Sequence, residues 1–156
     1  MADVVRTDVL IAGGGPCGLM LANELGRRGV SCLLVELKPG TAFNPQANAT
    51  QARTTAHFRR LGFAVEIRAQ GLPADHPTDI AYFTRYTGHE LARLHPPTAA
   101  QAVNNIKAMG GSWSAAELPH RVSQKFVGAT LRRHAEALPG RLQLRIGRLV
   151  PRQHAR

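Results

Sequence analysis

Cysteine and long apolar runs are both scarce in this sequence. Only 2 of its 156 residues are cysteines, and Cys17 and Cys32 have neither CxxC spacing nor the density of a disulfide scaffold. We therefore expect a reduced, cytoplasmic protein. No apolar run reaches the roughly 18 residues that span a bilayer, so we expect no membrane span. The opening "MADVVRTDVL" also lacks the basic and apolar regions of a secretory signal.

Acidic residues are the second shortage, because only 10 stand against 20 lysines and arginines, for a formal net charge of +10. Five of the arginines lie in 141–156, where no acidic residue occurs, and the rest of the chain has a net charge of +5. Zinc-finger spacing and the mixed aromatic and basic motifs of RNA-binding domains are missing. The seven histidines are scattered without metal-ligand spacing. We therefore expect neither a nucleic-acid partner nor a bound metal.

The sequence does contain a clear strand, helix and strand pattern near its start. Residues 8–12 form a short apolar run typical of a strand that is buried on both faces. Residues 16–28 carry apolar side chains at helical spacing, with Pro16 in the first turn and Gly29 following as a C-terminal stop. Residues 31–36 form a second apolar run. These elements predict a βαβ unit with two parallel strands and a right-handed crossover.

The remaining pattern predicts further helices and strands in an α/β fold. We expect a loop at 39–49, a helix at 50–61 closed by Gly62, and a hairpin of strands 80–85 and 90–94. An irregular segment is expected at 96–119. A helix should then run from Ser123 as N-cap to Leu138, ended by Pro139 and Gly140, and a strand should follow over Leu142, Leu144 and Ile146. The fold class is therefore a Rossmann-like βαβ fold, with a parallel sheet, crossover helices and part of a small β-rich layer.

Glycines occupy the seam between the first strand and the first helix. Gly13, Gly15 and Gly18 form G-x-G-x-x-G, in which the first permits a tight turn, the second admits a pyrophosphate, and the third lets helix and strand pack closely. Glu36 ends the second strand 18 residues after Gly18 and is placed to accept hydrogen bonds from ribose hydroxyls. The plain alternative is that the glycines only form a turn. The acidic Glu36 disfavours NADP, but the spacing leaves FAD and NAD both open.

Three segments resemble the start of the class A flavoprotein monooxygenases, which hydroxylate aromatic rings. They are "DVLIAGGGPCGLMLANELGRRGVSCLLVE", "QANATQARTTAHFRRLGF" and "HRVSQKFVGATLRRHAEALPG", in this order, and they cover the chain to about Gly140. Within this family, the segments closely resemble those of the branch that acts on phenols and aromatic polyketides. It implies an FAD-binding domain over 1–156, with a nucleotide-binding core at 1–75, a substrate-side insertion at 76–118, and a returning helix and strand at 119–156.

The resemblance also assigns residues to the cofactor. The positions that match those around the ADP half of FAD are Gly13, Gly15, Pro16, Cys17, Gly18, Glu36, Leu37 and Lys38. Arg53 matches an arginine near the flavin phosphate and ribityl chain, Gln124 matches a glutamine that hydrogen-bonds the ribityl chain, and Arg121 is assigned to the same patch. Without the resemblance, Arg53 would be interpreted as a solvated helix residue and Gln124 as an ordinary polar residue of a first turn.

The reaction that the resemblance implies is hydroxylation of a phenolic ring, with FAD, NADPH or NADH as reductant, and O2. The catalytic residues are unknown, and the aromatic side chains of 76–118 (Tyr82, Phe83, Tyr86 and Trp113) are expected either to line part of the substrate site or to lie in the core. The resemblance leaves a homodimer of the full-length protein open.

Two family motifs are missing, an Asp-Gly near the pyrophosphate and a Gly-Asp near the ribityl chain. Because relatives run to several hundred residues, we expect this chain to match their N-terminal third or so and to be inactive alone. The alternatives are a truncated, non-catalytic FAD-binding fragment and an NAD-dependent oxidoreductase with the same glycine motif.

Overall fold

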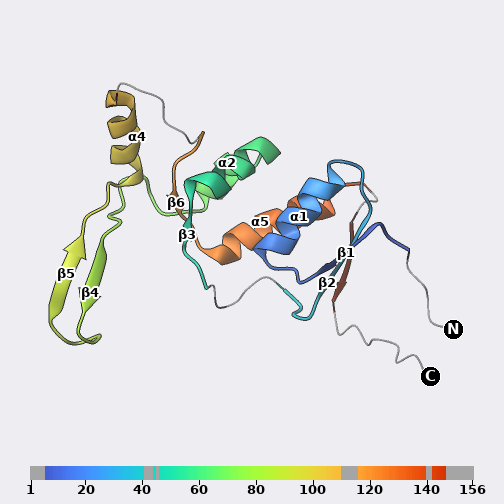
Figure 1. Ribbon diagram of the computed structural model, residues 1–156, viewed down its shortest axis with the longest axis horizontal. Coiled ribbons are helices and arrows are strands. Elements are labelled where there is room, and N and C mark those ends of the chain that lie inside the picture. The colour runs from blue at the N-terminus through green and yellow to red at the C-terminus, as the bar shows by residue number, and fades with distance from the viewer. Residues whose placement is uncertain (1–5, 41–43, 45, 110–115, 140–141, 147–156) are drawn as a thin grey trace. The chain divides into compact units, whose positions relative to one another are not determined.

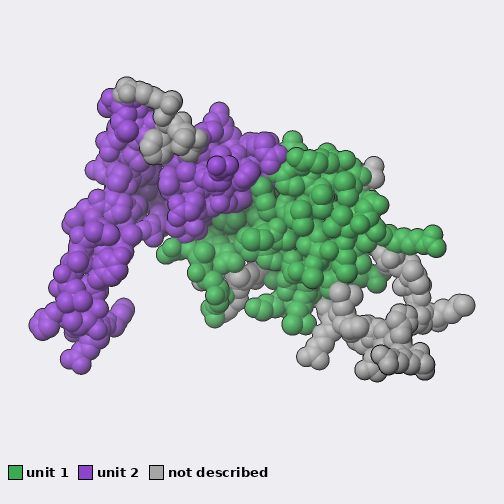
Figure 2. Space-filling view, viewed as in Figure 1, with its two compact units in different colours: residues 1–48, 123–156 green, residues 49–122 purple. Residues whose placement is uncertain are grey.

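The computed structural model describes residues 6–40, 44, 46–109, 116–139 and 142–146. The chain forms two compact units, which Figure 2 shows in different colours: 1–48 with 123–156, and 49–122. The functional division into a core at 1–75, an insertion at 76–118 and a return at 119–156 stays a prediction. Trp113, Gly140 and the arginine-rich 147–156 lie outside the described residues.

The first unit is built on a parallel sheet, as expected. It contains β1 (Val9–Ala12), α1 (Pro16–Gly26), β2 (Cys32–Glu36), α5 (Gln124–Glu136) and β7 (Leu142–Ile146) (Figure 1). The three strands are parallel in the order β1-β2-β7. The α/β class and the βαβ unit are therefore confirmed, and the last predicted strand joins the same sheet beside β2.

The side chains of β1 are less buried than expected for a strand that is covered on both faces. Only Ile11 is buried in β1, whereas Leu10 is 54% exposed. β2, in contrast, is buried at Cys32, Leu33, Leu34 and Val35. The reason is position, because β1 is an edge of the described sheet and β2 lies at its centre. The central strand thus carries most of the sheet's contribution to the core.

A buried asparagine joins α1 to α5, which run beside each other in Figure 1. The Asn23 side-chain amide is 2% exposed and donates to the Leu19 and Leu131 carbonyl oxygens, both at 2.8 Å. Ser123 occupies the N-cap position of α5 as predicted, but its side chain makes no capping hydrogen bond. The helix remains continuous through Gly128, so that glycine does not interrupt it.

The second unit combines short helices with two small antiparallel pairs of strands. Its elements are β3 (Ala49–Thr50), α2 (Ala52–Leu61), α3 (Ala64–Ala69), β4 (Ile80–Phe83), β5 (Glu90–Leu94), α4 (Ala99–Ala108) and β6 (His120–Arg121). β3 pairs with β6, and β4 pairs with β5. The predicted hairpin is therefore confirmed, and so is the helix that ends at Gly62, whose φ of 94° places it in the left-handed region.

The expectation of an irregular segment at 96–119 is wrong, because α4 lies within it. The helix begins with a capping box, in which Thr98 and Gln101 exchange side-chain and backbone hydrogen bonds. The core of this unit lies elsewhere, around Phe58 and Phe63, whose ring centroids are 5.7 Å apart. Tyr82, Phe83 and Tyr86 are exposed, so the alternative that they are core residues is also wrong.

Candidate dinucleotide site

The glycine motif lies at the carboxyl ends of parallel strands, where α/β sheets bind ligands. The chain leaves β1 at Ala12 and enters α1 at Pro16, and the Gly13 N–H donates to the Val35 carbonyl oxygen of the neighbouring strand at 2.8 Å. Gly13 has a φ of 107°, which a side chain would strain. The first glycine is therefore required by the backbone of the turn.

Gly18 is required by packing. A Cβ atom added to it would lie 2.0 Å from the Gly13 carbonyl oxygen and 3.2 Å from Cγ2 of Ile11. The first distance is far below any real contact of a Cβ atom, and the obstacle is backbone that cannot rotate aside. The third glycine thus lets α1 approach β1 closely, as the motif predicts.

Gly15 has neither of these internal reasons. Its φ of −72° and ψ of 179° suit any residue, and a Cβ atom there would meet nothing within 4 Å. What remains is space outside the protein, which is where the motif places a pyrophosphate. The structure therefore fits a dinucleotide at the position where the motif demands close approach.

The start of α1 adds the electrostatic part of this site. No side chain caps the helix, Pro16 is in its first turn, and no acidic residue lies there. The first N–H groups of a helix have no intrahelical acceptor, and the helix dipole makes this end positive. Cys17 is exposed in the same turn and is a free thiol. An anionic phosphate would satisfy these donors.

Glu36 lies across from the glycine loop at the end of β2. Its Oε2 accepts from the Gly14 N–H at 2.5 Å, and its Oε1 accepts from the Lys38 N–H at 2.8 Å. These backbone hydrogen bonds, that from Lys38 first and then that from Gly14, hold the pKa of Glu36 below its ordinary value. The carboxylate is therefore ionised, and its remaining lone pairs can accept from hydroxyl groups. Leu37, between Glu36 and Lys38, is 64% exposed.

Two contacts at this site were not predicted. Gly14 is not a glycine of the motif, yet a Cβ atom there would lie 3.1 Å from Glu36 Oε2. Gln124 opens α5, where its Oε1 accepts from the Gln46 N–H and its own N–H donates to the Ala47 carbonyl oxygen, both at 2.9 Å. Gln124 thereby ties the segment after β2 to α5, and its side-chain NH2 group is a donor for a further partner.

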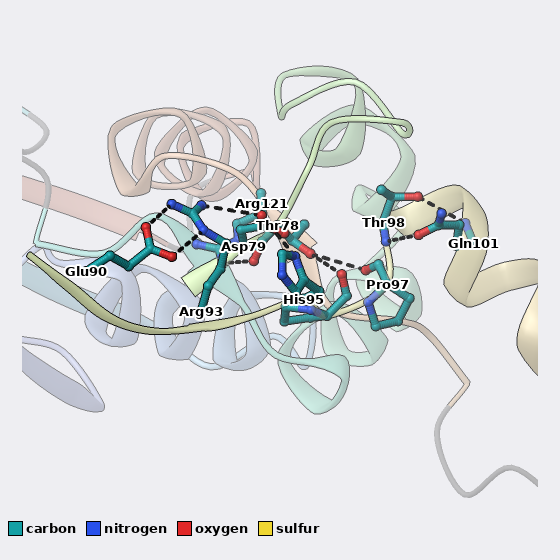
Figure 3. Close-up of polar contacts among 10 residues, drawn as sticks. Thr78, Asp79, Glu90, Arg93, His95, Pro97, Thr98, Gln101 and Arg121 are labelled. Atoms are coloured by element: carbon teal, nitrogen blue, oxygen red, sulfur yellow. Dashed lines mark hydrogen bonds and ion pairs between the residues drawn. The ribbon is translucent and has the colours of Figure 1, made fainter. Parts of the chain in front are cut away.

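The two predicted arginines belong to the second unit. Arg53 is exposed on α2 and makes no ion pair with any described residue. Arg121 is half-buried on β6, where its Nη2 donates to the Thr78 carbonyl oxygen at 3.3 Å (Figure 3). The approach of either arginine to the glycine loop stays a prediction, as does every assignment of a residue to FAD.

Other site types find no support in the part of the chain that the structure describes. No group of three or more His, Cys, Asp or Glu side chains is arranged to hold a metal ion there. Among the same residues, no helix has the length and apolar character needed to cross a bilayer.

Known proteins provide independent information on this site. The family model described as "FAD binding domain" matches residues 6–150. A 2,4-dichlorophenol 6-monooxygenase of Delftia acidovorans is 36% identical over 93 residues, which are 60% of this chain and 16% of that protein. A 6-methylpretetramide 4-monooxygenase of Streptomyces rimosus is 41% identical over 70 residues, 45% of this chain and 13% of that protein.

Solved structures agree with these relatives. RebC, soaked with chromopyrrolic acid and with 7-carboxy-K252c bound, has a TM-score of 0.70 and 37% identity over 91% of this chain and 26% of its own. PieE, a flavin-dependent monooxygenase in complex with FAD and substrate, has a TM-score of 0.73 and 30% identity over 94% of this chain and 24% of its own. The chain thus spans about a quarter of these structures. The family match also decides between FAD and NAD, which the glycine spacing left open.

Proposed function

The chain belongs to the FAD-binding domain family of the class A aromatic-ring flavoprotein monooxygenases, and we propose that it is the FAD-binding portion of an NAD(P)H-dependent enzyme that hydroxylates a phenolic or polyketide aromatic ring. The observation that carries the proposal is Gly15. Neither the backbone nor the packing requires a glycine there, and its missing side chain leaves open space for a pyrophosphate. The ring type follows from the names of the relatives, which include a dichlorophenol and a methylpretetramide monooxygenase.

The residues of this chain would bind and orient the cofactor. The N–H groups at the start of α1 would hold the pyrophosphate, and Glu36 would accept from the adenosine ribose. Gln124 would donate to the ribityl chain, and the exposed guanidinium of Arg53 would pair with phosphate oxygens. FAD itself would supply the redox chemistry when bound. A homodimer of a longer protein and a cytoplasmic location remain predictions.

A titration of the purified chain with FAD, followed by flavin fluorescence, tests this proposal. We expect saturable binding of FAD that an equal concentration of NAD does not displace. Displacement of FAD by NAD would favour the NAD-dependent alternative. Binding that is lost in Glu36→Ala, whose melting temperature is checked in parallel, would assign the ribose contact to Glu36.

We further propose that the chain alone does not complete the reaction, because it spans only 16% of the dichlorophenol monooxygenase that it resembles. Oxidation of NADPH can be followed by the loss of nicotinamide absorbance at roughly 340 nm. In the presence of a phenol, the chain with FAD should not oxidise NADPH faster than free FAD does. Turnover that depends on both the chain and the phenol would contradict this expectation. FAD binding without turnover would instead identify a non-catalytic FAD-binding fragment.

A further inference from the structure

A mostly apolar pocket of about 630 Å³ lies entirely within the second compact unit. This volume is in the range of small-molecule sites, about 300–1,000 Å³. Its lining comes from β3, β6, α4 and the segments around β4, and its apolar side chains include Leu72, Ile106, Met109 and Leu118. A pocket of this size and composition suits an apolar organic molecule.

Prolines make part of this pocket stiff. Four of them line it, namely Pro73, Pro96, Pro97 and Pro119. The Thr78 hydroxyl fastens one wall by donating to the Pro96 carbonyl oxygen at 3.0 Å. Because proline fixes its own φ and the hydroxyl holds the loop, this part of the pocket loses less conformational entropy when a ligand binds.

The charge of the lining has one sign. No Asp or Glu is among the described lining residues, which include Arg121, His76 and His120. Burial lowers the pKa of His120 and so favours its neutral form, and its Nε2 donates to the Arg68 carbonyl oxygen at 3.0 Å. Arg121 is therefore the described lining residue with a permanent charge.

Arg121 uses little of its hydrogen-bonding capacity. Among the residues that the structure describes, its guanidinium donates only to the Thr78 carbonyl oxygen, at 3.3 Å, and forms no ion pair. The acidic groups in Figure 3 have other partners: Asp79 contacts Arg93 at 3.4 Å and His95 at 3.1 Å, and Glu90 also pairs with Arg93. A half-buried cation beside apolar walls is costly without a counter-charge.

We propose that this pocket binds an aryl carboxylate, whose carboxylate pairs with the Arg121 guanidinium and whose ring lies against the apolar, proline-lined walls. A guanidinium offers two parallel N–H donors that match the two oxygens of a carboxylate. This proposal assigns Arg121 to the pocket and not to the flavin patch. The identification of the ligand as the substrate of hydroxylation rests on the proposed function, whereas the preference of the pocket for an anion does not.

The test compares 2-naphthoate with 2-naphthamide, which has the same ring and no charge, by calorimetric titration of the full chain. We expect the naphthoate to bind about tenfold more tightly, as one charge-assisted pair predicts. Arg121→Gln should remove this preference and leave the affinity for naphthamide unchanged. Arg85→Gln, an exposed arginine of the hairpin turn outside the pocket, should change neither affinity.

Two further variants test the same proposal if Arg121→Gln fails to fold. Arg121→Lys keeps the charge without the paired donors and should show an intermediate preference. Ala102→Phe, on the α4 face that lines the pocket, should weaken both ligands by filling the space. Equal affinities in the wild-type chain, or a preference that survives Arg121→Gln, would overturn the proposal.

FAD titrations of the same variants separate this proposal from the proposed function. FAD binding without a naphthoate preference would overturn the pocket assignment alone. A naphthoate preference without FAD binding would overturn the proposed function alone. If Arg121→Gln loses FAD and keeps the naphthoate preference, Arg121 belongs to the cofactor and the pocket assignment is wrong.

Discussion

The substitution Gly18→Ala tests the structural role of the glycine motif without any ligand. The new Cβ atom would lie 2.0 Å from the Gly13 carbonyl oxygen, so α1 has to move away from the turn after β1. Overpacking of this kind costs about 3 kcal/mol at the upper end of the usual range. Alanine returns about 1 kcal/mol through its better helix propensity. The net loss in the free energy of unfolding should therefore be about 2 kcal/mol.

The matched variant is Gly15→Ala, which makes the same chemical change three residues earlier. Its Cβ atom meets nothing within 4 Å, and the backbone is already in an ordinary conformation. We expect it to change the free energy of unfolding by about 0.5 kcal/mol or less, through the N-cap preference alone. Urea unfolding followed by circular dichroism, without FAD, measures both variants. Equal losses in the two, or a Gly18→Ala chain as stable as the wild type, would refute this reasoning.

Three other predictions follow from single contacts. Asn23→Ala removes both hydrogen bonds of the buried amide and should cost about 2 kcal/mol in urea unfolding; a loss near zero would contradict this. Glu36→Gln keeps only one of the two acceptor oxygens, so the hydrogen bond from either Gly14 or Lys38 is lost, and the FAD Kd should rise about tenfold. An unchanged Kd would exclude the role of the carboxylate. His120 has a pKa below its ordinary 6.5, so the unfolded chain binds the proton more readily and stability should fall as the pH drops below 6.5. In His120→Gln, which can still donate to Arg68, this part of the pH dependence should be absent; the same profile in both chains would argue against it.

Elements with a strong local pattern could be predicted from the sequence. The βαβ unit was predictable because apolar runs, a proline and glycines mark each boundary within a short stretch. The pattern of apolar residues does not predict α4, because none of its residues is buried and they form no core-facing stripe; the capping box of Thr98 and Gln101 is its one local signal. The pairing of β3 with β6 could not be predicted, since each strand has two residues and no local pattern links Ala49 to Arg121.

In the candidate site, too, some features could be predicted from the sequence and others depend on the fold. The motif predicts which glycines matter, and the structure adds why they differ: Gly13 for its φ, Gly18 for packing and Gly15 for outside space. The contacts between Glu36 and Gly14, 22 residues apart, and between Gln46 and Gln124, 78 apart, depend on how distant elements meet. The motif brings Glu36 and the glycines to one nucleotide, but it does not specify these hydrogen bonds without the fold.

The most direct test of the central claim is an FAD titration of Gly15→Val beside the wild-type chain, with the melting temperature of each recorded. The control is Gly40→Val, because a Cβ atom at Gly40 also meets nothing within 4 Å and lies outside the glycine loop. We expect Gly15→Val to lose FAD binding at an unchanged melting temperature, whereas Gly40→Val should keep it. FAD binding by a folded Gly15→Val chain with wild-type affinity would contradict the claim that the open space at Gly15 receives the pyrophosphate.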